Sequence, residues 1–250
     1  MIIFYNNTKG DFMANWLDRT KLLFGEDKIN KLINSKVCIF GVGGVGGYVC
    51  EALARSGIGS ITIVDNDVVS LTNINRQIIA TTSTIGMYKV DVMEKRIKDI
   101  NPNCNVEKYK CFFLPETKDQ FDFRNYDYVI DCIDTVTGKI ALVLKANEEN
   151  TKIISSMGTG NKTNPQAFLV SDIYKTSIDP LARVMRTELK KRKIKKLKVV
   201  YSTEYPKKPI LDSNIEIDSN KRQTPASNSF VPASAGLLIA SEVIKDLIKD

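Results

Sequence analysis

The sequence contains no histidine, and this absence removes several kinds of catalytic site. A histidine base, a Ser-His-Asp or Cys-His nucleophile and a histidine metal ligand are all excluded. The five cysteines form no Cys-x-x-Cys pair, so the thiolate pairs of a zinc knuckle are also missing. We expect Cys38, Cys50 and Cys132, which lie in apolar segments, to be buried reduced thiols.

Long apolar runs are missing as well. No stretch approaches the ~20 apolar residues of a membrane-spanning helix, and residues 1–15 lack the regions of a signal peptide. Hydrophobic residues make up 43% of the 250 residues and charged residues 26%, which is ordinary for a globular protein. These properties predict a cytoplasmic enzyme with no membrane partner.

Positive charge is concentrated in one segment of the chain. The formal net charge is +7, and nine of the basic residues lie between Arg183 and Lys198, where Glu188 is the one acidic residue. A cluster of one sign at this density often faces a polyanion. A solvated helix surface would have the same composition.

Short buried strands alternate with helices from residue 35 onwards. We expect strands at 36–40, 60–64, 106–110, 128–133 and 152–156, and helices at 45–56, 88–100 and 137–150. This alternation predicts an α/β fold with a Rossmann-like, doubly wound, mostly parallel sheet. After residue 157 we expect a C-terminal extension of mixed strands, at 168–173 and 198–202, and a closing helix at 233–248.

A glycine-rich turn joins the first strand of this core to the helix that follows. Residues 41–46 fit the pattern G-x-G-x-x-G, with glycine at Gly41, Gly43, Gly44 and Gly46. Glycines let the backbone approach phosphate, and the helix N-terminus offers free N–H groups and a positive dipole. Asp65 ends the next strand, where an acid can bond ribose hydroxyls. The turn predicts a nucleotide site that suits NAD and ATP equally.

Polar residues beyond Asp65 favour ATP. They are Asp67, Asn73, Arg76, Gln77 and Lys89. An arginine and a lysine at the strand ends would neutralise a triphosphate and stabilise charge that develops on phosphorus. The pyrophosphate of a dinucleotide needs only the loop and the helix dipole. Taken singly, each of the two cations is equally compatible with a solvated surface position.

Two carboxylates stand at the end of the strand expected at 128–133. Carboxylates near phosphates suit Mg²⁺, which binds oxygen ligands and retains several waters. Asp131 is compatible with a structural cap, whereas Asp134 lies further out. We therefore predict Asp134 as the metal ligand.

Three regions of one domain follow from these patterns. Residues 1–34 form an N-terminal helical segment, with a helix at 16–32 whose apolar positions are Leu22, Leu23, Ile29 and Leu32. Residues 35–157 form the ATP-binding core, and 158–250 complete the same domain. Within the last region lie the basic segment 183–198 and a polar stretch, 212–229, that we expect to be a mobile loop.

Five separated elements resemble, in order, the adenylating domain of ubiquitin-activating-type enzymes. They are the glycine turn, Asp65-x-Asp67, Asn73-x-x-Arg76-Gln77, Lys89 and Asp131-x-x-Asp134. This superfamily includes the adenylyltransferases of molybdopterin and thiamin synthesis. The resemblance implies that the glycine loop and Asp65 hold the phosphates and ribose of ATP, and that Asn73, Arg76 and Lys89 contact the phosphates. It implies Mg²⁺ at Asp134, and it is compatible with a monovalent cation, Na⁺ or K⁺.

Other segments are similar to one group of this superfamily, the tRNA threonylcarbamoyladenosine dehydratases. They are Arg19-Thr20 with Leu23-Phe24-Gly25, Asp172 to Ala182, Tyr201 to Glu204, and Asn228 to Pro232. Arg19 stands where the superfamily has an arginine that reaches the partner subunit's active site, which implies a homodimer. The zinc cysteines of the molybdopterin and thiamin relatives are absent, as in the dehydratase group.

The resemblance implies ATP-dependent dehydration, by cyclisation, of N6-threonylcarbamoyladenosine at position 37 of tRNA through an acyl-adenylate. Intramolecular ring closure can reach effective molarities of about 10⁵ M or more, so it requires no enzyme nucleophile. The lack of any cysteine after Cys132 agrees with this chemistry. The basic segment would then contact tRNA phosphates, and a sulfur-transfer or electron-transfer partner protein is left open.

Three other interpretations remain at this point. An adenylyltransferase that activates the C-terminus of a ubiquitin-like sulfur-carrier protein would need no tRNA, and the missing zinc motif and the basic segment argue against it. An NAD-dependent oxidoreductase is disfavoured by Asn73, Arg76 and Lys89. A catalytically silent binding protein is disfavoured because no carboxylate or cation of the motifs is missing.

Overall fold

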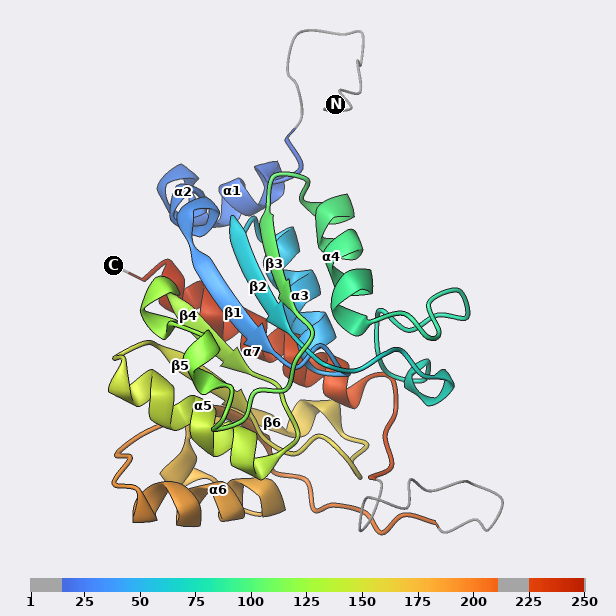
Figure 1. Ribbon diagram of the computed structural model, residues 1–250, viewed down its shortest axis with the longest axis vertical. Coiled ribbons are helices and arrows are strands. Elements are labelled where there is room, and N and C mark those ends of the chain that lie inside the picture. Colours follow the sequence, from blue (N-terminus) through green and yellow to red (C-terminus); the bar gives the residue numbers. More distant parts are fainter. Residues whose placement is uncertain (1–14, 211–224, 250) are drawn as a thin grey trace, which may run out of the picture.

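The computed structural model describes residues 15–210 and 225–249. Seven strands in these residues form one sheet in the order β3-β2-β1-β4-β5-β7-β6 (Figure 1). Neighbouring strands run parallel, except that β6 is antiparallel to β7. The strands are β1 (Lys36–Phe40), β2 (Ser60–Val64), β3 (Asn105–Tyr109), β4 (Tyr128–Asp131), β5 (Ile153–Ser156), β6 (Phe168–Asp172) and β7 (Lys198–Ser202).

Helices cover both faces of the sheet. On one face, α3 (Gly46–Arg55), α4 (Lys89–Ile100) and α7 (Val231–Leu247) enclose the largest apolar core. On the other face lie α5 (Val136–Glu148) and α6 (Pro180–Lys191), with their own apolar cluster. Central strands buried on both sides are mostly apolar, as residues 37–40 and, except for Thr62, residues 61–64 are. The predicted doubly wound α/β fold, with its mixed C-terminal extension and closing helix, is confirmed.

The N-terminal segment differs from its prediction. Two helices, α1 (Asp18–Phe24) and α2 (Glu26–Asn34), replace the single helix expected at 16–32. The chain breaks at Gly25, whose φ of 87° lies in the left-handed region that glycine adopts without strain. Ile29 and Leu32 of α2 are buried as expected, but Leu22 and Leu23 of α1 are 89% and 75% exposed. The expectation that α1 packs its leucines inward is therefore wrong.

Helix α6 is missing from the elements predicted above. Most of the basic segment 183–198 lies on it and on the turn that follows. Asp179 caps the helix by accepting a hydrogen bond from the Ala182 N–H, and Pro180 occupies its first turn. Its buried positions are Ala182, Met185 and Leu189, which have the i, i+3, i+7 spacing of one helix face. The signal for this helix is therefore present in the sequence, although cations surround it.

The order of the strands creates a switch point at the carboxyl edge of the sheet, and this place is called the crevice below. β1 and β4 are neighbours, and at their carboxyl ends β1 leads to α3 on one face while β4 leads to α5 on the other. Ligands of open α/β sheets bind at such a switch point. Of the loop predicted at 212–229, residues 212–224 lie outside the described residues. No helix of the described residues is long and apolar enough to cross a membrane.

Candidate nucleotide site

The glycine turn occupies the β1 side of this crevice and needs glycine for steric reasons. A Cβ on Gly46 would lie 1.8 Å from the carbonyl oxygen of Gly41, so no side chain fits there. Gly41 itself has a φ of 89°, and a Cβ on it would lie 2.8 Å from the Cys132 carbonyl oxygen. A Cβ on Gly43 would meet nothing closer than Gln77 Nε2, at 3.8 Å. The backbone of Gly43 is therefore open to a ligand.

Asp65, at the end of β2, holds the glycine turn in place. Its Oδ2 accepts a hydrogen bond from the Val42 N–H at 2.7 Å, and its Oδ1 accepts one from the Asp67 N–H at 2.8 Å. Burial raises the pKa of the Asp65 carboxyl, and Lys89 and the two N–H groups oppose that rise. Each oxygen keeps a second lone pair for a hydroxyl donor such as a ribose.

Lys89 begins α4 and brings a buried cation to the same place. Its Nζ lies 2.6 Å from Asp67 Oδ2 and 3.9 Å from Asp65 Oδ1. The side chain of Lys89 is 7% exposed, whereas that of Asp67 is 55% exposed. The ammonium group is thus fixed at the edge of the crevice by one partner that faces solvent.

The connection after β2 supplies the remaining polar residues. It contains the 3-10 helix η1 (Leu71–Asn73), and Asn73 Oδ1 accepts a hydrogen bond from the Ser70 N–H. Arg76 Nη1 donates to the carbonyl of Thr72 at 2.9 Å, and a Cβ on Gly44 would lie 3.5 Å from Arg76 Cγ. Partial burial lowers the pKa of the Arg76 guanidinium, which nevertheless stays protonated at neutral pH.

Gln77 gives a direct indication that a ligand belongs here. It is buried beside Gly43, and its Oε1 has no hydrogen-bond partner. A buried carboxamide oxygen without a donor costs about 1–3 kcal/mol. A hydroxyl, an amino group or a water brought in with a nucleotide would supply the missing donor.

The two carboxylates after β4 have different surroundings. Asp131 is fully buried, and its Oδ1 lies 2.9 Å from Nζ of Lys139, which is also fully buried on α5. This ion pair anchors α5 behind the loop that carries Asp134, while the second oxygen of Asp131, Oδ2, has no hydrogen-bond partner among the described residues. Asp134 itself is exposed at the carboxyl edge. No group of three or more acidic or cysteine side chains is placed to hold a metal in the described residues.

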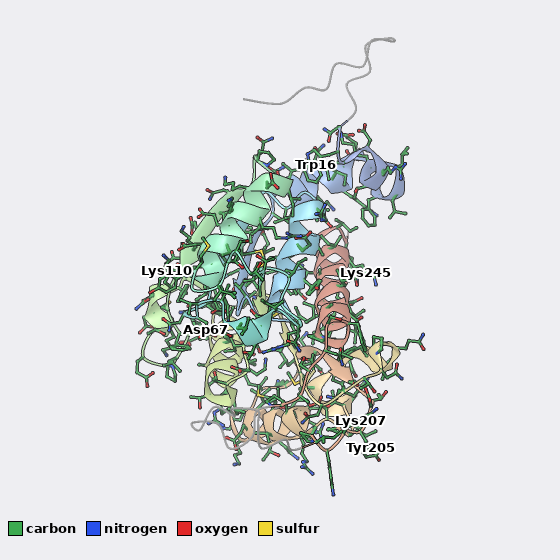
Figure 2. The ribbon with its side chains drawn as sticks, turned by 90° about the vertical axis from the view of Figure 1, so that its right-hand side faces the viewer. Trp16, Asp67, Lys110, Tyr205, Lys207 and Lys245 are labelled. Atoms are coloured by element: carbon green, nitrogen blue, oxygen red, sulfur yellow. The ribbon has the colours of Figure 1, made fainter. Side chains whose placement is uncertain are left out.

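Arg19 is the one predicted catalytic residue that lies away from this cluster. It is exposed on α1, next to Leu17, whose side chain packs against Gly57. Gly57 follows the C-terminal end of α3, about 15 Å of helix from the glycine turn at its N-terminal end. Figure 2 shows the same separation, with Trp16 near the top of the molecule and Asp67 well below it. Arg19 therefore does not reach the crevice of its own chain.

Two buried lysines that pair with a buried aspartate were not among the predicted site residues. Lys139 pairs with Asp131, and Lys162, in the loop after β5, lies 2.9 Å from Asp179 Oδ2. A signal existed for Lys139, because it directly precedes the apolar run 140–144 of α5. For Lys162 no local pattern exists, since its partner is 17 residues away.

Comparison with known proteins agrees with this geometry. The ThiF family matches residues 17–250, which is most of the chain. The chain belongs to the ThiF family. Within the family, the tRNA threonylcarbamoyladenosine dehydratase of Bacillus subtilis is 44% identical, and the similarity covers 95% of this chain and 96% of that protein.

Solved structures place the chain with the same ThiF-family members. Escherichia coli tRNA N6-threonylcarbamoyladenosine dehydratase, solved in complex with AMP and with ATP, is 34% identical, with a TM-score of 0.83 over 92% of each chain. A protein of another kind matches a smaller part of the chain. The adenylyltransferase and sulfurtransferase of Vanderwaltozyma polyspora is 39% identical, but the match covers 53% of this chain and 30% of that protein.

Proposed function

We propose that this protein uses ATP to dehydrate N6-threonylcarbamoyladenosine at position 37 of tRNA, through an acyl-adenylate that cyclises. The decisive observation is the cluster in which Lys89, Asp65 and Gln77 surround the glycine turn, in a chain similar over its whole length to the dehydratases. The relative with sulfurtransferase activity matches only about half of the chain. The dehydratase function is therefore favoured over activation of a sulfur-carrier protein.

The first step forms the adenylate. A carboxylate oxygen of the threonylcarbamoyl group attacks the α-phosphorus of ATP, the bond to the β-phosphate breaks, and pyrophosphate leaves. Negative charge builds up on the phosphate oxygens in this step. Arg76 and Lys89, together with the backbone N–H groups at the start of α3, are placed to stabilise that charge.

The second step closes the ring. A nitrogen of the same modification attacks the activated acyl carbon and loses its proton, and AMP leaves with the former carboxylate oxygen. The net change on the tRNA is the loss of one water. Attack within one molecule makes a covalent enzyme intermediate unnecessary.

The cysteines support direct cyclisation. Cys38 and Cys50 are completely buried, and burial raises the pKa of both thiols. Burial also raises the pKa of Cys132, the cysteine nearest to the crevice. A neutral buried thiol is a poor nucleophile. These positions do not suit an enzyme that transfers the acyl group to its own cysteine.

A divalent cation fits the site as a partner of the substrate. Mg²⁺ is usually held by one or two carboxylates together with substrate phosphates, and it retains water. Asp134 supplies one exposed carboxylate at the carboxyl edge of β4. Mg²⁺ bound there would neutralise part of the phosphate charge.

The exposed face of α1 supports a homodimer. No residue of α1 is buried, and Leu22 and Leu23 point apolar surface into solvent. Adjacent apolar side chains exposed in this way mark contact surfaces. A second copy that covers α1 would also bring Arg19 toward a crevice other than its own. We also propose a cytoplasmic location, because the substrate is tRNA.

The basic segment supports tRNA binding at a smaller set of residues than its composition suggests. Lys191 and Arg192 pair with Glu188, and Lys198 pairs with Glu242 and Asp246. The six other cations of the segment have no ion pair within residues 15–210 and 225–249. Arg186 donates to Thr176, and the remaining five are exposed: Arg183, Lys190, Lys193, Lys195 and Lys196. The helix starts near the carboxyl edge and extends about 18 Å away, so an RNA stem could follow it.

One assay tests the reaction and its alternative. The protein is incubated with ATP and tRNA that contains threonylcarbamoyladenosine, and the nucleosides are analysed by mass spectrometry. A product lighter by one water supports the proposal, and its absence would reject it. Pyrophosphate exchange that depends on a small carrier protein instead of tRNA would support the sulfur-carrier activator.

A further inference from the structure

The loop that follows β5 is attached firmly to the segment that precedes α7. The Asn161 N–H donates to the Ala226 carbonyl at 2.8 Å, and the Ala226 N–H donates back to Asn161 Oδ1 at 2.7 Å. Gly160 touches Pro225 so closely that a Cβ would lie 2.7 Å from its ring. Two stretches more than sixty residues apart thus form one unit.

Asn228 is the residue that joins this unit to a helix. Its Oδ1 accepts hydrogen bonds from the N–H groups of Phe230 at 3.2 Å and Val231 at 2.9 Å, at the start of α7. Its Nδ2 donates to the carbonyl of Lys162 at 2.8 Å. One side chain therefore binds the N–H groups at the start of α7 and the loop after β5 at the same time.

Both segments that Asn228 joins, the start of α7 and the loop after β5, lead to part of the crevice. On the α7 side, Pro232 lies against the glycine turn, since a Cβ on Gly44 would be 3.3 Å from Pro232 Cβ. On the loop side, the buried ammonium of Lys162 is bonded to the Gly158 carbonyl and to Asp179, which caps α6. The loop is fixed to α6 and, through Asn228, to the support of the glycine turn.

The loop lies where the second substrate has to approach. The carboxyl ends of β1 and β2 are taken by the glycine turn and Asp65, which mark the place of the nucleotide. β5 pairs with β4 on the other side, in a register that puts Ser155 next to Asp131. A carboxylate that attacks the α-phosphorus therefore comes over the carboxyl ends of β4 and β5.

We propose that Asn228 is a positioning residue, which sets the loop after β5, and hence the threonylcarbamoyl group, at the correct place relative to ATP. The proposal rests on the dehydratase function proposed above. Because Asn228 acts on the relative placement of the two substrates, it affects kcat, the rate of reaction when ATP and tRNA are both bound. It contributes little to the affinity for ATP alone.

The variant Asn228→Asp separates this role from support of the start of α7. Aspartate keeps an oxygen for the N–H groups of Phe230 and Val231, and its side chain accepts hydrogen bonds at a helix start as well as that of asparagine does. It loses the Nδ2 donor and places a second oxygen opposite the Lys162 carbonyl. A control is Asn34→Asp, which removes a similar amide donor to the Asn30 carbonyl on α2, far from the crevice.

The experiment measures turnover and ATP affinity on the full-length protein with modified tRNA. We expect Asn228→Asp to lower kcat for the dehydrated nucleoside by about 10- to 100-fold, as small misplacements of reacting groups do. ATP Kd, from calorimetry, and thermal midpoint should stay close to those of Asn34→Asp. An unchanged kcat, or a rise in ATP Kd as large as the fall in kcat, would overturn the positioning role. If the unaltered protein forms no dehydrated product, the proposed function itself fails, whatever the variant does.

Discussion

Lys89 and Asp67 are 22 residues apart in the sequence, and their side chains meet with 2.6 Å between Nζ and Oδ2. The lysine is buried and the aspartate half-exposed, so the aspartate orients the ammonium toward the open side of the crevice. We expect Lys89→Met to lower kcat/KM for dehydration by about 10²- to 10³-fold, because a preorganised cation is lost at the phosphate. Single-turnover formation of pyrophosphate would measure this.

A matched substitution on the same helix controls for the loss of charge. Lys95 is exposed on α4, and Lys95→Met should leave the rate within about twofold of the unaltered protein. Equal losses in the two variants would show that Lys89 has no special part in the reaction. Asp67→Asn should lie between them, since Lys89 stays but is less well oriented.

Two glycines of the turn should respond differently to the same change. Gly46→Ala puts a methyl group 1.8 Å from the Gly41 carbonyl oxygen, so the backbone must move and the protein loses stability. Gly43→Ala meets no protein atom closer than 3.8 Å, so the fold should tolerate it while the methyl group hinders the nucleotide. Thermal unfolding and ATP titration of both variants check this. A Gly43→Ala protein with normal ATP affinity would place the nucleotide elsewhere.

The sequence predicted elements whose signal is local. The glycine turn, Asp65 at the end of β2 and the strand β1 could be placed because their residue types and spacing lie within one strand–turn–helix unit. Lys89 and Arg76 could be predicted as site residues, but their hydrogen-bond and ion-pair partners could not be predicted. The Asp67–Lys89 contact and the Lys162–Asp179 contact depend on how distant segments pack.

The leucines of α1 show why other predictions failed. Leu22 and Leu23 have the spacing of a buried face, but a short helix broken at Gly25 does not reach the core. Apolar spacing indicates that one face of a helix packs against something, but it does not distinguish the core of the same chain from a second chain. Conversely, Ala182, Met185 and Leu189 of α6 have helical spacing and are buried, but the many cations of this segment directed the prediction to its charge instead.

Glu51 on α3 should make stability depend on acid pH. Burial raises its pKa, but hydrogen bonds from Arg96 and Arg55 outweigh this and lower the pKa overall. The stabilisation is therefore present above the unfolded-state value near 4.5 and is lost as pH falls through the lower folded value. Because both arginines are partly exposed, we expect roughly 1 kcal/mol. Urea unfolding between pH 6 and 3 measures the free energy of unfolding at each pH. This free energy should fall less steeply with decreasing pH in Glu51→Gln than in the exposed control Glu116→Gln.

Arg19 should act on the crevice of a second copy. It lies at the amino edge of its own sheet, so it cannot contribute to its own site. Arg19→Ala should therefore remove activity by taking the arginine from the site of the partner subunit. Mixing Arg19→Ala with Asp134→Asn subunits would then create dimers in which one crevice has both residues. In a two-fold symmetric dimer, random exchange should restore about a quarter of normal activity.

The exposed leucines provide the control for this complementation. Leu22→Asp with Leu23→Asp should give a monomer by light scattering, since charge on a covered apolar face opposes contact. When this pair is added to both subunits, mixing should restore nothing. Recovery without a dimer, or no recovery from a mixture that forms one, would exclude a trans role for Arg19. With recovery confined to the mixed dimer, the active unit must be two chains, because each crevice is complete only with α1 of the other.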